Sequence, residues 1–174
     1  MSAQLETLVF RRATVADAGG LAPVLVEGFE TFREFSPPDF EPPRVEDAAD
    51  DLAARLGNPA VWCLLAESSA DVAGYVSLLP AAEARRPVGD PGLAHLSMLY
   101  VRAAWWGTGL AKRLHAAACE AAATQGYAAM RLFTLNHQGP ARRFYERAGW
   151  VLADGPYFDE ERRVSVVEYR RPVA

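Results

Sequence analysis

Residues 96–111, LSMLYVRAAWWGTGLA, change character twice. They begin as an apolar run typical of a buried strand, and they end with the spacing of a helix. Between the two parts lie Gly107 and Gly109, where a ligand can approach the backbone because no Cβ is in the way. The start of a helix carries N–H groups without partners and a partial positive charge, so it binds phosphate. We therefore predict a phosphate-binding strand–turn–helix, although a plain tight turn is the commoner explanation of Gly-x-Gly alone.

Two familiar phosphate-binding motifs do not match this turn. The dinucleotide-binding pattern Gly-x-Gly-x-x-Gly fails because Lys112 stands at the third glycine position. The Walker loop fails because the ending Gly-Lys-Ser/Thr is missing. The phosphate ligand is therefore not identified by this turn alone.

Composition excludes several classes of function. The chain has 174 residues, 51% of them hydrophobic and 23% charged, which is ordinary for one globular domain over residues 1–174. A net charge of −4 argues against nucleic acid as a partner, because a phosphate backbone needs a basic face. No apolar run approaches the roughly 20 residues of a membrane span, and the N-terminus lacks the pattern of a secretory signal. We expect a cytoplasmic protein with no membrane partner.

The cysteines and histidines do not predict a metal site. Cys63 and Cys119 lie in apolar segments, which is typical of buried thiols in a reducing compartment. His95, His115 and His137 lack the spacing of metal ligands. We therefore expect no metal.

The order of the predicted elements indicates the fold class. Apolar and β-branched runs predict strands at residues 8–12, 62–67, 72–79, 93–101, 130–135, 150–153 and 164–170. Helical spacing predicts helices at about residues 14–32, 44–56, 107–123 and 139–148. Neighbouring strands follow one another in the first half, and strands alternate with helices in the second. We expect an α/β (α+β) fold with a mixed, mostly antiparallel central sheet of about seven strands and helices on both faces.

Turn signals delimit these elements. Residues 14–17 resemble a capping box with Asp at the last position. Pro23 is compatible with the first helix only if it falls in the first turn. Four prolines in residues 36–43 predict a loop, and residues 80–92 form a second polar loop that is long enough to be functional.

A second informative stretch is residues 136–150, NHQGPARRFYERAGW. Together with residues 101–111, it resembles the GNAT superfamily of N-acetyltransferases, whose order of elements is similar to that of nearly the whole chain. The family motif Gln/Arg-x-x-Gly-x-Gly/Ala matches residues 104–109, with Ala104 in place of Gln or Arg. The second motif, Asn…Ala-x-x-Phe-Tyr-x-x-x-Gly-Phe, matches residues 136–150, with Trp150 in place of Phe.

The resemblance implies acetyl-CoA as co-substrate. In the family, N–H groups of the glycine turn bind the pyrophosphate, and the preceding strand pairs with pantetheine through its main chain. An N–H near Leu99 would face the thioester oxygen. The implied cofactor-binding residues are Met98, Leu99, Tyr100, Val101, Trp106, Gly107, Thr108, Gly109, Leu110, Ala111, Lys112, Asn136, Arg142 and Tyr145. A solvated helix face for Lys112 and a strand-end cap for Asn136 are open alternatives.

The resemblance also implies direct attack in a ternary complex. A neutral primary amine attacks the thioester carbonyl, an oxyanion forms, and CoA thiolate leaves. Tyr145 matches the tyrosine that protonates this thiolate, and a phenol with a pKa of about 10 suits a thiol with a pKa of about 8.5. A core aromatic side chain with a hydrogen-bonded hydroxyl is the alternative for Tyr145.

The acceptor side is less determined. Candidates for the general base or for contact with the acceptor are Glu27, Glu30, Phe32, Glu83, His95 and Ser97. Alternation places His95 and Ser97 on one strand face. The alternative for His95 is a buried core position, which is commoner for a histidine in an apolar strand. Nine acids within residues 27–51 favour a cationic amine or form a solvated helix face, whereas Arg85 and Arg86 favour a carboxylate or a CoA phosphate.

The resemblance therefore predicts an acetyl-CoA-dependent N-acetyltransferase that acts on the primary amine of a small molecule. Two alternatives stay open. One is a protein N-terminal or lysine acetyltransferase, and the other is a non-catalytic acyl-CoA-binding or sensor domain of the same fold. Many relatives form homodimers, which no feature of this sequence tests.

Overall fold

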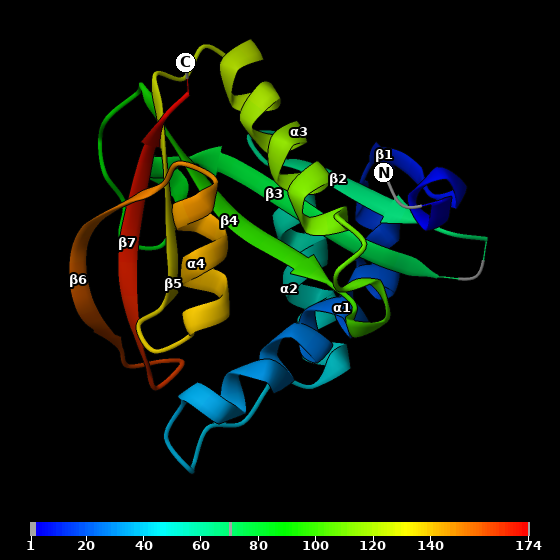
Figure 1. The fold of residues 1–174 in the computed structure, drawn as a ribbon, viewed down its shortest axis with the longest axis horizontal. Coiled ribbons are helices and arrows are strands. Elements are labelled where there is room, and N and C mark those ends of the chain that lie inside the picture. The colour runs from blue at the N-terminus through cyan, green and yellow to red at the C-terminus, as the bar shows by residue number, and fades with distance from the viewer. Residues whose placement is uncertain (1–2, 70, 174) are drawn as a thin grey trace.

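The computed structural model describes residues 3–69 and 71–173, whose strands form one seven-stranded sheet in the order β1-β2-β3-β4-β5-β7-β6 (Figure 1). The strands are β1 (Val9–Arg12), β2 (Trp62–Glu67), β3 (Val72–Pro80), β4 (Leu93–Val101), β5 (Ala129–Leu135), β6 (Val151–Asp159) and β7 (Val164–Pro172). All neighbours are antiparallel except β4 and β5, which are parallel. The predicted fold class is confirmed.

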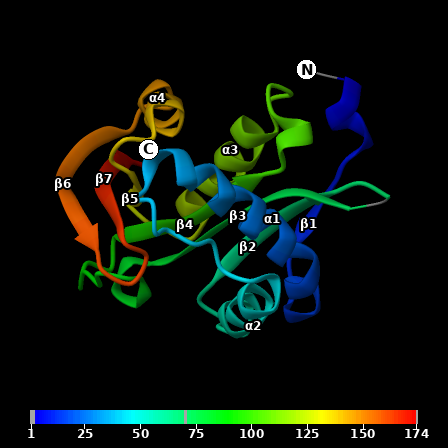
Figure 2. The ribbon, with the colours of Figure 1, turned by 90° about the horizontal axis from the view of Figure 1, so that it is seen from below.

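Two helices cover each face of the sheet (Figures 1 and 2). They are α1 (Ala18–Glu30), α2 (Val45–Leu56), α3 (Leu110–Thr124) and α4 (Gly139–Arg147). Leu21 of α1 and Leu52 of α2 pack with Tyr75 of β3. Leu114 of α3 lies in the opposite cluster with Val76, because successive strand residues point to opposite faces. No helix in the described ranges is both long and apolar enough to cross a bilayer.

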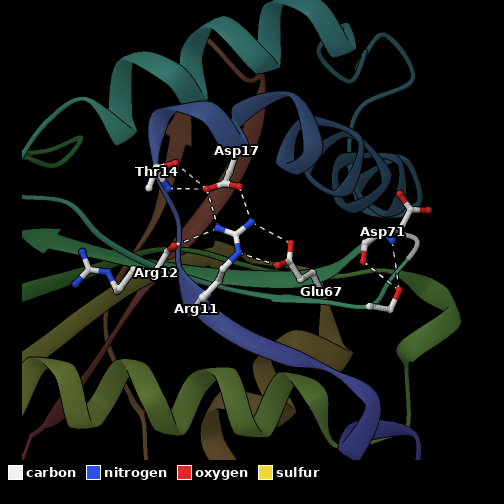
Figure 3. A network of polar contacts seen from close by, with 7 residues as sticks. Arg11, Arg12, Thr14, Asp17, Glu67 and Asp71 are labelled. Atoms are coloured by element: carbon white, nitrogen blue, oxygen red, sulfur yellow. Dashed lines mark hydrogen bonds and ion pairs between the residues drawn. The ribbon is translucent and has the colours of Figure 1, made fainter.

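The beginning of α1 is fixed to the edge of the sheet by Arg11 of β1 (Figure 3). Its guanidinium lies 2.7 Å from Asp17 Oδ1 and 2.7 Å from Glu67 Oε1. The hydrogen bond from Arg11 lowers the pKa of Asp17 to about 2. Asp17 also closes the predicted capping box with Thr14, so one carboxylate orients both the strand and the helix.

Strand β4 does not alternate strictly. Leu78 pairs with Leu96, but Ser77 pairs with Met98, so Ser97 is an extra residue in a β-bulge. Leu96 therefore packs toward α3 while Met98 packs toward α1 and α2, although strict alternation would give them the same face. The bulge shifts the face of every residue after Ser97.

Strands β4 and β5 separate soon after they begin. Their pairing covers only Leu93 to His95 against Ala129 to Arg131. Beyond His95, β4 continues to Val101 with one edge unpaired, while β5 stays paired with β7 on its other side. Figure 1 shows the two strands diverging toward the start of α3. The sheet is thus open between β4 and β5.

Three predicted boundaries are wrong. Pro23 lies inside α1 rather than in its first turn, because a 3-10 turn at Val15–Asp17 leads directly into a helix that begins at Ala18. Helix α3 begins at Leu110 rather than at Gly107, because Gly107 and Gly109 have φ angles of 75° and 93°.

The third wrong boundary is the end of strand β6. The strand extends to Asp159 instead of ending at residue 153. Register shifts between Leu152 and Tyr157 let this edge strand continue through Gly155 and Pro156, which the sequence pattern predicted to be part of a loop.

Replacing Gly28 by alanine is expected to destabilise the fold. A Cβ at Gly28 would lie 2.3 Å from Cδ1 of Tyr100, because α1 crosses β4 at that point. Overpacking of this kind costs about 1–3 kcal/mol of unfolding free energy. Urea unfolding of Gly28→Ala measures it, with Gly19→Ala as control, since a Cβ at Gly19 meets nothing within 4 Å. A Gly28→Ala variant as stable as the wild type would contradict this close packing.

Candidate active site

A cleft of about 1400 Å³ begins where β4 and β5 separate. Its walls include β4 from Leu96 to Val101, β5 from Phe133 to Leu135, and Tyr145 of α4. It continues between α1, α2 and the turn that joins β6 to β7. Both motifs singled out in the sequence therefore border one cavity.

The glycine turn lies at one end of this cleft, next to Trp106 and Ala111, which line it. The hydroxyl of Thr108 donates to the carbonyl oxygen of Trp105 at 2.6 Å and closes the turn. Within the described residues, the backbone N–H groups of Gly107, Gly109, Ala111 and Lys112 make no hydrogen bond. A Cβ at Gly107 would meet no atom within 4 Å. The turn therefore presents free donors beside open space, as phosphate binding requires.

The unpaired edge of β4 leads to this turn. The indole nitrogen of Trp106 donates to the carbonyl oxygen of Val101 at 2.9 Å, which fixes the turn to the end of the strand. Residues 96–101 all line the cleft, so an extended chain placed there can pair with the strand. The edge and the turn together form a continuous main-chain surface.

Tyr145 closes the cleft on the side of α4. It is 9% exposed and packs edge to face against Phe144 and Trp150, at 5.2 and 6.0 Å between ring centres. Burial raises the pKa of the phenol above its usual value, so it stays protonated at neutral pH. Within residues 3–69 and 71–173 its hydroxyl has no hydrogen-bond partner. The Tyr145 phenol can therefore donate its proton without breaking a hydrogen bond within the fold.

The predicted cofactor residues do not all line the cleft. Seven of those predicted line the cleft: Met98, Leu99, Tyr100, Val101, Trp106, Ala111 and Tyr145. Arg142 instead donates to the Tyr169 hydroxyl at 2.9 Å and to the Asn136 carbonyl at 2.9 Å, which ties the start of α4 to β5 and β7. Lys112 is exposed on α3. Direct contacts from Arg142, Asn136 and Lys112 stay predictions.

The predicted acceptor residues divide into two groups. Phe32, Glu83, His95 and Ser97 line the cleft. The other two predicted residues, Glu27 and Glu30, do not line the cleft. The Glu27 carboxylate accepts the N–H of Ala103 at 2.6 Å, and Glu30 pairs with Arg33 at 2.6 Å.

The hydroxyl of Ser97 lies 2.7 Å from that of Ser77, its neighbour across the bulge. Both His95 and Ser97 line the cleft, as alternation predicted for this pair. Met98, Leu99 and Tyr100 line the cleft as well. Because of the bulge, Met98 and Tyr100 pack with the α1 and α2 cluster, whereas Leu99 packs against the α3 cluster.

His95 lies deep in the cleft and is 7% exposed. Its ring centre is 5.5 Å from that of Phe133, and its Nδ1 has no hydrogen-bond partner in the described part of the chain. Burial, and then the positive charges of Arg131, Arg55 and Arg162, lower its pKa to about 3. His95 is therefore neutral at physiological pH.

Unfolding is expected to become easier in mild acid because of two neutral histidines. Burial lowers the pKa of His115, which accepts the indole N–H of Trp150 at 2.8 Å, to about 4, and that of His95 to about 3. The unfolded chain takes up these protons near pH 6.5, so it binds more protons than the folded chain below that pH. The unfolding free energy should therefore fall from pH 6.5 toward pH 4, by up to about 1.4 kcal/mol per pH unit for each histidine.

Urea unfolding between pH 7.5 and 4.5 measures this slope. The double variant His95→Gln, His115→Gln should show a much flatter profile over that range. A slope equal to that of the wild type would contradict burial of the neutral imidazoles.

Two arginines are among the lining residues that were not found from the sequence. Arg55 of α2 and Arg162 of the β6–β7 turn both reach the cleft. The run of charged residues 160–163 between two strands was a visible signal, but nothing in it showed which loop it would face. Among the described residues, no group of three His, Cys, Asp or Glu side chains could hold a metal ion.

Comparison with known families gives a match over most of the chain. The model of the family described as "Acetyltransferase (GNAT) family" matches residues 27–150. This range includes the open edge of β4, the glycine turn and α4. A comparison with curated proteins finds no match.

Solved structures share the fold at low sequence identity. The acetyltransferase of the GNAT family from Streptococcus pneumoniae is 21% identical, with 96% of this chain and 99% of that chain covered and a TM-score of 0.67. The PaiA N-acetyltransferase from Thermoplasma acidophilum, in complex with coenzyme A, is 16% identical, with 97% and 98% covered and a TM-score of 0.68. The yncA protein from Salmonella typhimurium, with its cofactor acetyl-CoA, is 16% identical, with 96% and 94% covered and a TM-score of 0.70.

Proposed function

Because this chain belongs to the GNAT family of acetyltransferases, we propose that it transfers the acetyl group of acetyl-CoA to the primary amine of a small molecule. One observation carries the proposal. The unpaired edge of β4 ends at a turn where the N–H groups of Gly107, Gly109 and Ala111 have no partners in the described residues. A pantetheine chain can pair along the edge while its pyrophosphate accepts the N–H groups of Gly107, Gly109 and Ala111.

The mechanism follows from what borders this path. An extended chain on the β4 edge brings its thioester to the middle of the cleft, where a main-chain N–H near Leu99 can stabilise the oxyanion. Tyr145 lines the same region and protonates the departing thiolate. The acceptor ammonium must lose a proton before it attacks, and His95, Glu83 and Ser97 are the candidates from the sequence that line the cleft and can take or relay it.

We also propose that residues 1–174 form one acetyltransferase domain. The family match ends at residue 150, but β6 and β7 complete the same sheet, and β7 pairs with β5 along the cleft wall. Strand β1, before the match, pairs with β2 at the other edge. The flanking segments therefore belong to the unit that carries the site.

Release of free thiol from acetyl-CoA in the presence of a panel of primary amines tests the function. We expect release that depends on the amine, and a product heavier by one acetyl group in mass spectrometry. Saturable acetyl-CoA binding without turnover of any amine would instead favour a non-catalytic acyl-CoA-binding domain. Release only with peptides would favour a protein acetyltransferase.

A further inference from the structure

The end of the cleft away from the glycine turn is enclosed by three segments that ion pairs hold together. Arg163 of the β6–β7 turn lies 3.0 Å from Asp39 in the loop before α2. Arg85, in the loop after β3, pairs with Glu161 and lies 3.6 Å from Asp159. The acceptor end is therefore a built pocket.

The acids near this end are mostly engaged or at the rim. Of the nine acids in residues 27–51, only Asp39, Glu41 and Asp51 line the cleft. Asp39 is paired with Arg163, and Glu41 and Asp51 are exposed. Glu83 accepts the side-chain N–H of Asn58 at 2.8 Å. The acidic helices do not supply a free carboxylate deep in the pocket.

Two arginines that line this end of the cleft, Arg55 and Arg162, are less completely paired than Asp39. Arg55 lines the pocket, is exposed as Glu41 and Asp51 are, and has no ion pair or side-chain hydrogen bond with the described residues. Arg162 lies 3.5 Å from Asp159, but that carboxylate is shared with Arg85. The guanidinium carbon of Arg162 is 5.9 Å from the centre of the Phe29 ring, which places its charge against the inner wall. The charge of Arg162 is thus only partly neutralised.

His95 marks the bottom of the same pocket. Its Nδ1 is buried and has no hydrogen-bond partner within the described chain. The charged groups that act on its pKa are Arg131, Arg55 and Arg162, with no carboxylate among them. Arg131 donates to the carbonyl oxygens of Arg85 and Arg86, so it is not available to a ligand. Asp159 and Glu161 also line the cleft, so the pocket is not positive as a whole, but the lining groups whose charges act on His95 are the guanidiniums of Arg55 and Arg162.

Building on the proposed function, we infer that the acceptor carries an anionic group, a carboxylate or a similar oxyanion, close to its amine, and that Arg162 binds that group with help from Arg55. A guanidinium presents two parallel N–H donors that match the two oxygens of a carboxylate. Phe32 and Phe133 line the same cavity and suit an apolar remainder of the molecule.

Matched pairs of amines test this. L-Phenylalanine is compared with 2-phenylethylamine, and L-methionine with 3-(methylthio)propylamine, each pair differing only in the carboxylate. We expect the wild type to use the carboxylated members at least about 100-fold more efficiently in kcat/KM, because a site built for a polar group rejects an analogue that lacks it. 1-Amino-2-phenylethylphosphonate distinguishes a preference for phosphonate from one for carboxylate.

Variants assign the effect to Arg162. Arg162→Gln should lower kcat/KM for the carboxylated amines at least about 30-fold and that of 2-phenylethylamine much less, while Arg162→Lys should recover part of the loss. Arg147→Gln is the control, because Arg147 is also an arginine but is exposed on α4 and does not line the cleft. Equal thermal unfolding of the three variants excludes a loss of fold.

A probe that needs no turnover separates the two proposals. 3-Phenylpropionate should bind the CoA-loaded wild type in titration calorimetry, and its Kd should rise at least about 10-fold in Arg162→Gln. If acetyl-CoA itself does not bind, the proposed function fails. If acetyl-CoA binds but 3-phenylpropionate does not, or if 2-phenylethylamine is acetylated as well as phenylalanine, the anionic acceptor is overturned and the proposed function stands.

Discussion

Gly107→Val is expected to weaken acetyl-CoA binding at least about 100-fold, which corresponds to about 2.7 kcal/mol. Gly107 has a φ of 75°, a conformation that a β-branched residue adopts only under strain. A turn that relaxes to relieve this strain no longer aims its N–H groups at the phosphate. A turn that does not relax places two methyl groups in the open space beside those donors. Either response removes phosphate binding, and titration calorimetry measures the loss.

Gly126→Val provides the matched control. Gly126 has a φ of 83°, and a Cβ there also meets nothing within 4 Å, but it follows the other end of α3. Both variants should lose similar stability in urea, whereas only Gly107→Val should lose acetyl-CoA. Unchanged acetyl-CoA affinity in Gly107→Val would show that this turn does not bind the pyrophosphate.

Tyr145→Phe is expected to lower kcat by about 100-fold or more while leaving the Kd for acetyl-CoA unchanged. A positioned general acid contributes about 10²–10⁴-fold to rate, and the Tyr145 phenol is protonated because burial raises its pKa. Its hydroxyl bonds to no described residue, so its removal leaves no buried partner unsatisfied. The change should therefore affect turnover rather than folding.

Tyr75→Phe is the control for this variant. The Tyr75 hydroxyl is also buried, but it donates to Sδ of Met98 on the α1 side of β4 and does not line the cleft. We expect Tyr75→Phe to keep the wild-type kcat. A Tyr145→Phe enzyme with wild-type kcat would mean that the thiolate takes its proton from water.

The part of the fold that depends on local pattern was predictable from the sequence. The bounds of β4 and the hairpin of β2 and β3 follow from apolar runs between clear turn residues. The motif carrying Gly107 and Gly109 was visible for the same reason, because only glycine takes a positive φ without cost.

Other features depend on contacts between distant segments. The bulge at Ser97 arises in the pairing of β4 with β3, so alternation along the chain cannot show that Leu99 packs on the α3 side. Glu27 looked like a base on an acidic helix, yet α1 turns it toward the N–H of Ala103. Arg162 was missed because its loop reaches the cleft only when β6 and β7 fold against β5.

The proposed function depends most on acetyl-CoA binding along the open edge of β4. Hydrogen–deuterium exchange with and without saturating acetyl-CoA tests this binding most directly. We expect exchange to slow over residues 96–112, where the strand and the turn gain hydrogen bonds to the ligand, and to stay unchanged in β2 at the far side of the sheet. Unchanged exchange over residues 96–112 in the presence of bound acetyl-CoA would contradict it.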